Sequence, residues 1–386
     1  MRKTFIFLIV AFACAVSCTN KANGGSGSEA DTVSAVVAQV DTFSYKGYTI
    51  LANILAGKEI QDKSVLANVS STQAYTEHQE ELTELWAQYK ASDINAIREW
   101  AKENITEVVD TVFYPFGGPD FNYLASFFPD CRYSLLVGME KGGLLPFSDK
   151  ESQKDCADIL SALRESISSN IHSSFFVPRD MRTDLNNEYI KGTVPVVMMF
   201  VALHGFDVIT VNPVHLDVDG DICYTDSANV FAHTLDKDYE EGFEIMYRKP
   251  DEKGIRRVVY LSSDLSNEGF NKSGLAAVVN KTFKGKTTFL KAASYCPHEP
   301  MFSSIQKAIL DNSNMIISGP SGMPYTAISP TVWNIKLYGN YVGPIQAFLA
   351  YPQMELKKRY EKGETTPIKF RFGYGRSSSF FMAVRK

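Results

Sequence analysis

The stretch that decides the fold is VVDTVFYPFGGPDFNYLASFFPDCRYSLLVGMEKGG, residues 108–143 of a 386-residue chain. Residues 108–114 are mostly β-branched and aromatic, as in a strand, and the turn at residues 115–119 contains two glycines and two prolines. Asp120 then stands at the N-cap of a short apolar helix, and residues 132–137 predict the next strand. A strand, a crossover helix and a strand make a parallel βαβ unit, which indicates an α/β protein.

The carboxyl ends of these strands are the expected place for a binding site, because ligands of parallel sheets bind beyond those ends. Asp120 follows the first strand and Glu140 follows the second. Polar residues also follow a later predicted strand and occupy the loops of the last third of the chain. We therefore expect six side chains to line one concavity: Asp120, Glu140, Asp264, Asn267, His298 and Tyr325. The alternative is that Asp120 only caps its helix and that Glu140 pairs with a surface lysine such as Lys141.

Beyond this unit, the sequence predicts a mixed sheet. Residues 243–248 and 255–261 read as the two strands of an antiparallel hairpin. Residues 193–203 are apolar nearly all round, which is typical of a helix buried against a sheet. The expected fold is therefore α/β, with a Rossmann-like parallel βαβ centre, antiparallel hairpins and flanking helices.

Three further segments have a predicted conformation. Residues 43–50 are expected to form a short edge strand or hairpin arm. Residues 287–296 and 302–310 are apolar-faced and predict helices. Ser92 is expected to cap a second helix after a first one that begins near residue 73.

Alternating aspartates at residues 217, 219 and 221 leave two interpretations open. A calcium loop of the EF-hand type would need glycine at its sixth position and glutamate at its twelfth, where this chain has Ile222 and Ala228. The other interpretation is a hairpin with Asp219-Gly220 as a two-residue type I′ turn. The hairpin is favoured.

The N-terminus predicts an exported lipoprotein. Two cations precede an unbroken apolar run over residues 5–16, as in a signal peptide. This run is shorter than the roughly 20 residues of a membrane-spanning helix. Ala15-Val16-Ser17-Cys18 resembles the lipobox of bacterial lipoproteins, which implies a lipid on Cys18 and, because Thr19 follows, an outer-membrane location.

Composition and charge indicate how the chain is divided and which partners it can have. Residues 1–17 are the expected signal peptide, residues 18–40 the lipidated cysteine and a flexible glycine-rich tether, and residues 41–386 one α/β domain. With 45% hydrophobic residues, the chain can bury a large core. Its net charge of −5 and scattered lysines argue against a nucleic-acid partner. The expected partners are the membrane, through the lipid, and an unknown small molecule or envelope protein.

The sequence does not match the familiar catalytic and metal-binding patterns. Residues 318–322 are out of register with the G-x-S-x-G elbow, and no P-loop occurs. Cys296-Pro-His298 lacks the second pair of ligands that a zinc site needs, so no metal is expected.

The first βα turn resembles that of Rossmann-like enzymes, including class I methyltransferases, in which an acidic residue after the second strand binds ribose. Gly117-Gly118 and Glu140 hold the corresponding places. The turn lacks the G-x-G spacing, however, and Pro119-Asp120 puts a ring and a negative charge where a phosphate would approach. Adenosyl and nicotinamide cofactors are also not expected outside the cytoplasm, so no cofactor is expected.

Several short motifs resemble those of an uncharacterised group of bacterial exported proteins with no established activity. They are Gly118-Pro-Asp-Phe-x-Tyr123 with Phe127-Phe-Pro129, Leu136-Val-Gly-Met-Glu140, Lys291-Ala-Ala-Ser-Tyr295 with His298, Ser321-Gly-Met-Pro-Tyr325, and Leu337-Tyr-Gly-x-Tyr341 with Pro344-Ile345. Two functions stay open. One is a non-enzymatic ligand- or partner-binding lipoprotein, and the other is a hydrolase-like extracytoplasmic enzyme that uses Asp120 and Glu140.

Overall fold

The computed structural model describes residues 45–60, 66–143, 145–146, 152–173, 190, 192–224, 240–374 and 378–386. These residues belong to one unit of the chain, Phe43–Lys386. The expected signal peptide, Cys18 and the tether lie outside the described residues, so their assignment stays a prediction.

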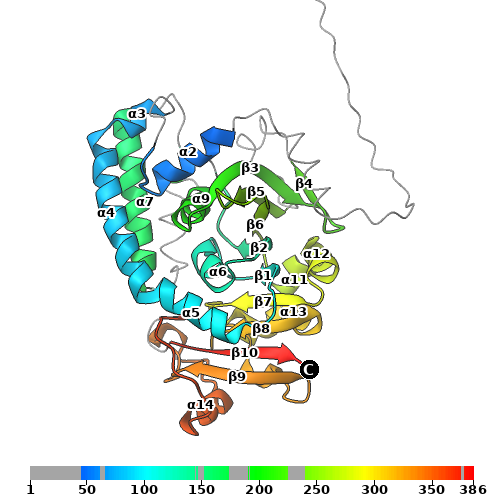
Figure 1. The fold of residues 1–386 in the computed structure, drawn as a ribbon. Coiled ribbons are helices and arrows are strands. Elements are labelled where there is room, and N and C mark those ends of the chain that lie inside the picture. The colour runs from blue at the N-terminus through cyan, green and yellow to red at the C-terminus, as the bar shows by residue number, and fades with distance from the viewer. Residues whose placement is uncertain are drawn as a thin grey trace, which may run out of the picture. The chain divides into compact units, whose positions relative to one another are not determined.

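The described chain is organised around one ten-stranded mixed sheet in the order β4-β3-β5-β6-β2-β1-β7-β8-β10-β9 (Figure 1). The strands are β1 (Thr111–Tyr114), β2 (Tyr133–Gly138), β3 (Asp207–Leu216), β4 (Ile222–Tyr224), β5 (Glu240–Arg248), β6 (Arg256–Ser262), β7 (Lys286–Leu290), β8 (Ser313–Ser318), β9 (Trp333–Gly339) and β10 (Ser379–Arg385).

The centre of the sheet is parallel and both of its sides are antiparallel. Strands β6, β2, β1, β7 and β8 all run the same way. Strands β5, β3 and β4 extend one side as antiparallel neighbours, and β10 and β9 extend the other. The expected α/β fold with a mixed sheet is therefore confirmed.

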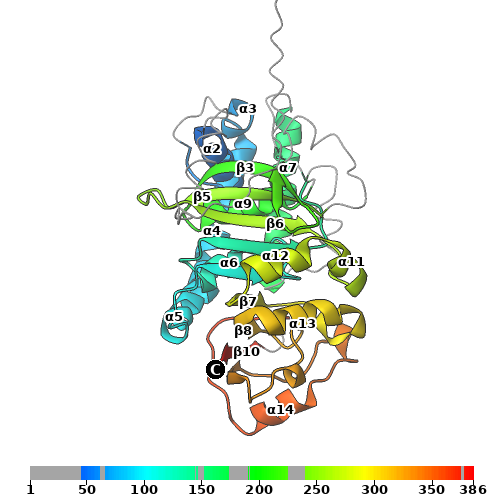
Figure 2. The same cartoon turned by 90° about the vertical axis from the view of Figure 1, so that its right-hand side faces the viewer.

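Helices cover both faces of the sheet (Figures 1 and 2). One core joins the sheet to α2 (Tyr45–Leu55), α4 (Gln73–Tyr89), α5 (Asn95–Asn104), α6 (Phe121–Phe127), α7 (Gln153–Ser173) and α9 (Val194–Leu203). The opposite core joins it to α11 (Asn267–Lys272), α12 (Leu275–Thr282), α13 (Ser303–Asn312) and α14 (Met354–Glu361). A short helix, α3 (Ala67–Ser70), precedes α4. The parallel strands are thus covered on both faces, as a Rossmann-like centre requires.

The predicted βαβ unit is present as β1, α6 and β2. Tyr123 N donates to the Asp120 carboxylate, so Asp120 caps α6 as expected. Helix α9 is buried nearly all round, and β5 pairs with β6 as the expected antiparallel hairpin.

Three sequence predictions are wrong. Residues 45–55 form helix α2 instead of a strand, because the side chains at Leu51, Ile54 and Leu55 share a face that packs on α9 and β3. Residues 286–290 form strand β7 instead of a helix. Ser92 caps no helix, because a π-helical turn (Lys90–Ile94) joins α4 directly to α5.

The aspartate-rich turn is a hairpin, but not of the expected type. Strands β3 and β4 pair antiparallel around it. Only Gly220 has a positive φ, +82°, whereas a type I′ turn needs positive φ at both central residues. The Asp217 carboxylate instead accepts the backbone N–H groups of Asp219 and Asp221, at 3.0 and 2.8 Å. A longer loop organised by Asp217 therefore replaces the two-residue turn.

Candidate functional site

The site lies where the order of the parallel strands reverses. Strand β1 pairs with β2, the next strand in the chain, on one side and with β7 on the other. The chain therefore leaves β1 in one direction through α6 and β2 and later returns to its other flank. In such sheets, the crevice beyond the carboxyl ends of the strands at this switch point is the usual binding place.

A cavity of about 150 Å³ occupies this crevice. Its walls are the loops that follow β1, β2, β6 and β7, together with one side chain from the segment before α13 and one from the segment before β10. The lining residues are Tyr114, Phe116, Gly117, Gly118, Asp120, Gly138, Met139, Glu140, Asp264, Leu265, Lys291, Ala292, Ala293, Ser294, Cys296, Phe302 and Tyr374.

Glycine lets the first two loops approach closely. A Cβ on Gly138 would lie 2.8 Å from Gly118 Cα and 2.7 Å from both the Glu140 carboxylate and the Tyr260 hydroxyl. These contacts are closer than real Cβ atoms accept. A side chain at position 138 would therefore displace Glu140 from the cavity wall.

The lining residues Lys291 and Asp120 form a buried ion pair. The Lys291 ammonium contacts the Asp120 carboxylate, and the two side chains are only 2% and 3% exposed. The same carboxylate accepts the Tyr114 hydroxyl at 2.9 Å and the Tyr123 backbone N–H at 3.3 Å. Asp120 is therefore saturated with donors, which is what a buried carboxylate requires.

Lys291 is held by an aromatic ring as well as by its counter-ion. Its ammonium lies 3.5 Å from the centroid of the Tyr123 ring, a cation–π contact. Burial lowers the pKa of Lys291, and the negative charge of Asp120 opposes that shift. The Lys291 amine is thus kept in one place and out of water.

Two other carboxylates, Glu140 and Asp264, line the same cavity. Glu140 is half-buried, and the Tyr260 hydroxyl donates to its backbone carbonyl at 2.7 Å and lies 3.5 Å from its carboxylate. Burial raises the pKa of Glu140 above its ordinary value. Asp264 is exposed, and its carboxylate accepts the backbone N–H and the hydroxyl of Ser266.

The loop after β7 holds two strained residues. Ser294 and Tyr295 both have positive φ, +49° and +59°, although neither is glycine. The Tyr374 hydroxyl holds this turn by accepting the Ser294 backbone N–H at 2.9 Å, and Ser321 accepts the Ala293 N–H at 3.1 Å. Strain of this kind clusters at functional sites, where the surroundings hold it in place.

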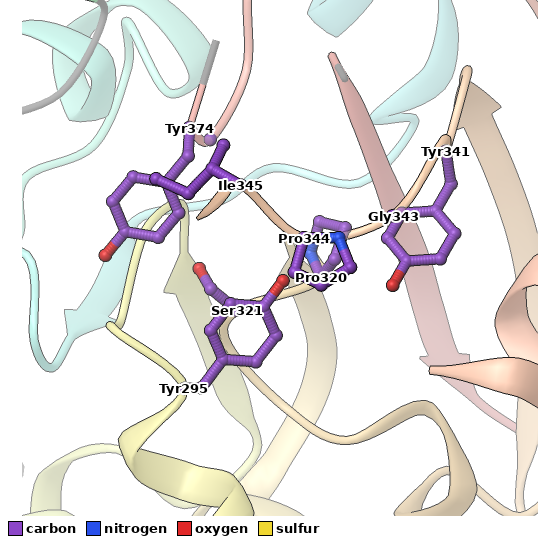
Figure 3. Close-up of a pocket in the computed structure, with 9 residues that line it drawn as sticks. Tyr295, Pro320, Ser321, Tyr341, Gly343, Pro344, Ile345 and Tyr374 are labelled. Atoms are coloured by element: carbon purple, nitrogen blue, oxygen red, sulfur yellow. The ribbon is translucent and has the colours of Figure 1, made fainter. Parts of the chain in front are cut away.

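A second, smaller cavity is lined in part by Tyr295 of this loop. Figure 3 shows Tyr374 and Ile345 facing Ser321 and Tyr295 across it. Its volume is about 20 Å³, which is room for about one water molecule. Because Tyr374 lines both cavities, it forms the wall between them.

The structure brings three of the six sequence-predicted residues together. Asp120, Glu140 and Asp264 line the same cavity. One part of the alternative interpretation is correct, because Asp120 caps its helix. It does more than cap, however, because it also pairs with Lys291. Glu140 contacts Tyr260, and not the surface lysine that the alternative gave it.

The other three predicted residues do not line the cavity. The Asn267 amide ties α11 to the start of α13 by bonding Pro300 O and Ser304 N, at 3.0 and 2.8 Å. The His298 ring packs against Tyr295, with 5.0 Å between centroids. Tyr325 is buried, and its ring packs against a strand residue of β10. We therefore remove Asn267, His298 and Tyr325 from the candidate site.

Sequence reasoning missed the lysine and the tyrosine that complete the site. Lys291 was hidden because residues 287–296 predict a helix, which gives no reason to place its side chain at a sheet edge. Its one signal is a lone charge directly after an apolar run, in the motif Lys291-Ala-Ala-Ser-Tyr295. Tyr374 comes from a loop far along the chain, and its sequence carries no signal for this position.

Metal and membrane-spanning features are not found in the described ranges. Among those residues, no three His, Cys, Asp or Glu side chains gather closely enough to hold a metal ion. No helix within the same ranges is both long enough and apolar enough to cross a membrane. The sulfhydryls of Cys131 and Cys296 are free, and burial raises the pKa of Cys131 to about 12.

Comparison with known proteins found no matching family model, no matching curated protein and no matching solved structure. The function therefore has to be argued from the chemistry of the cavity.

Proposed function

We propose that this protein is a non-enzymatic binding lipoprotein of the bacterial envelope, and that its cavity binds a small nucleoside-like ligand without phosphate groups. The observation that carries this proposal is the position of Glu140, which shares a cavity with the glycine turn that follows β1. It stands about twenty residues beyond those glycines, as the acidic residue that accepts ribose hydroxyls does in dinucleotide-binding sheets.

The charges of the cavity argue against a phosphate. Asp120, Glu140 and Asp264 face a single ammonium, Lys291, which already pairs with Asp120. A dinucleotide site would also place its pyrophosphate at the N-terminus of the crossover helix. Here the Asp120 carboxylate occupies the end of α6. The donor set therefore does not fit a dinucleotide cofactor, and it favours a neutral or cationic ligand.

The lining residues suit a flat ring system with a vicinal diol. Apolar and aromatic surface comes from Phe116, Leu265 and Phe302. The rings of Phe116 and Phe302 pack edge to face, with 5.8 Å between their centroids. The Glu140 carboxylate supplies acceptors for two hydroxyl groups. A planar base beside these side chains and a ribose diol at Glu140 would satisfy both kinds of surface.

Titration calorimetry with adenosine, 2′,3′-dideoxyadenosine and AMP tests the proposal. We expect adenosine to bind, and the other two to bind more weakly, because one lacks the diol and the other brings a phosphate to an acidic cavity. The Glu140→Gln variant should weaken adenosine binding by about 10–100-fold, the value of hydrogen bonds to a charged acceptor. Glu361→Gln, on the exposed face of α14, is the matched control. Equal binding of adenosine and AMP, or no binding of adenosine at millimolar concentration, would refute the proposal.

The geometry favours binding over the hydrolase alternative. A general base needs a free acceptor within reach of the proton that it removes. Asp120 already accepts from Tyr114, Tyr123 and Lys291. Glu140 alone does not make the pair of carboxylates that the alternative requires.

We also propose that a lipid on Cys18 anchors the protein to the outer membrane, in keeping with the lipobox-like Ala15-Val16-Ser17-Cys18. In cells, the Cys18→Ala variant should leave the membrane fraction or remain unprocessed. Normal processing together with unchanged membrane fractionation would contradict the anchor. This experiment is independent of the ligand, so the two halves of the proposal can fail separately.

A further inference from the structure

We propose that Phe116 is a specificity-determining residue of the cavity at the switch point (the switch-point cavity), and that its ring stacks on the flat base of the ligand. This inference rests on the proposed nucleoside binding. It adds which part of the ligand is selected, namely an aromatic ring system and not the sugar alone. Its basis is a strained backbone at Phe116 together with the place of this residue on the cavity wall.

The backbone of Phe116 is left-handed, with φ at +61°. This conformation is costly for a bulky side chain, and glycine is the usual residue there. Three other non-glycine residues in the described ranges have a positive φ. They are Ser294 and Tyr295, in the loop after β7, and Leu66, before α3. Most of this strain thus lies in the loops after β1 and β7, the two strands at the switch point, and strain of this kind clusters at functional sites.

The turn that carries Phe116 is held by its neighbours. Gly117 lies so close to the Tyr114 ring that an added Cβ would be 2.4 Å from a ring carbon. The Gly118 N–H donates to the backbone carbonyl of Val137, in β2, at 3.3 Å. The turn is therefore formed before a ligand binds, and binding does not have to order it.

Phe116 lines the cavity and keeps part of its surface accessible. It is half-buried, and so is Phe302, which packs on it edge to face and lines the same cavity. Met139 also lines the cavity and is 75% exposed, so the cavity reaches the protein surface. A flat base that enters the cavity can thus contact an aromatic ring that the protein covers only in part. Stacking of a base on such a ring is favourable because every base has a π-face.

Titration calorimetry with adenosine on the full chain tests the proposal. Phe116→Ala should weaken adenosine binding by about 5–150-fold, the range that base–aromatic stacking contributes. Phe116→Tyr keeps an aromatic face and should bind adenosine as the wild type does. Leu66→Ala is the matched control, because Leu66 is also a partly buried apolar residue with a positive φ, +52°, but does not line the cavity. It should leave adenosine binding unchanged.

A fluorescence measurement tests the stacking without relying on a loss of affinity. In the Phe116→Trp variant, an adenine ring stacked on the introduced indole should quench its emission. Adenosine should leave the emission of the wild type unchanged, because its three tryptophans do not line the cavity: Trp86, Trp100 and Trp333.

The outcomes separate this inference from the proposed function. If the wild type binds adenosine and Phe116→Ala binds it equally well, Phe116 only packs against Phe302, and the inference is wrong while the proposed function stands. Unquenched emission of Phe116→Trp at saturating adenosine would overturn the stacking in the same way. If the wild type itself does not bind adenosine, the proposed function has failed and the inference fails with it.

Discussion

Two ion pairs of this sheet have similar surroundings but differ in both residue types. In the antiparallel part, Glu244 of β5 is fully buried, contacts Arg257 of β6 and accepts the Tyr224 hydroxyl at 2.9 Å. At the parallel centre, Asp120 contacts Lys291 and also accepts a tyrosine hydroxyl. Both cations lie over a tyrosine ring.

The difference lies in the cation and in what surrounds it. Arg257 is 29% exposed and keeps its charge under all ordinary conditions, whereas Lys291 is 2% exposed and can give up a proton. Only the lysine pair lines the switch-point cavity. Burial and full hydrogen bonding are therefore common to both pairs, and they do not mark a functional site.

The largest expected effect is that of removing the buried lysine. Lys291→Met should lower the free energy of unfolding by about 3–5 kcal/mol, because it leaves the Asp120 carboxylate buried without its counter-ion. Urea denaturation followed by circular dichroism measures this loss. A loss below about 1 kcal/mol would show that water reaches Asp120, and the pair could then not be called buried.

The same substitution in the other pair should cost less. Arg257→Met should lower the free energy of unfolding by about 1–3 kcal/mol, because the arginine is partly exposed and water can approach the carboxylate that it leaves. Hydrogen bonding does not distinguish the pairs, since Glu244 and Asp120 would each keep two donors. Both variants are measured under the same conditions. If Arg257→Met lowers the free energy of unfolding as much as Lys291→Met does, the two ion pairs do not differ in their effect on stability.

The smallest expected effect is a pH dependence of the free energy of unfolding that comes from Glu140. Burial raises the pKa of Glu140 in the folded protein above its ordinary value of 4.5. The folded state therefore binds this proton more tightly than the unfolded state. Stability from Glu140 is complete below the unfolded pKa and declines as the pH rises through the folded pKa. Glu140→Gln removes this decline, so its stability relative to the wild type should increase between pH 4 and pH 7.

Urea denaturation at several pH values measures this relative stability, with Glu361→Gln as the control, since its carboxylate is exposed on α14. Parallel curves for wild type and Glu140→Gln over the whole range would mean that Glu140 is solvated like a surface carboxylate. Of these two lining residues, only Lys291 would then be desolvated.

The sequence predicted the centre of the fold because local signals agree there. Glycine and proline punctuate residues 115–119, Asp120 caps α6, and strands lie on both sides, so Asp120 and Glu140 could be assigned to one sheet edge. Strand β7 was missed for a physical reason. Both of its faces are covered, so its residues show no polar–apolar alternation, and a short apolar run cannot be told from a helix by period alone.

The rest of the site depends on contacts that no local pattern encodes. Tyr374 reaches the cavity through a hydrogen bond to Ser294, a residue 80 positions earlier. Asn267 follows a strand, as the prediction required, but its amide is used to join α11 to α13. Helix α2 shows the same effect on secondary structure, because its packing on α9 and β3 outweighs the strand propensity of its aromatic and β-branched residues.

The place of β10 in the sheet has a consequence for how the chain is made. This strand, residues 379–385, is the last in sequence order, yet it lies between β8 and β9. The chain is made, and by our proposal exported, from its N-terminus, so β8 has one open edge and β9 lacks its partner strand until residues 379–385 are available to fold. An open edge of this kind invites pairing with other chains. The seven residues of β10 thus cover the open edge of β8 and attach β9 to the sheet.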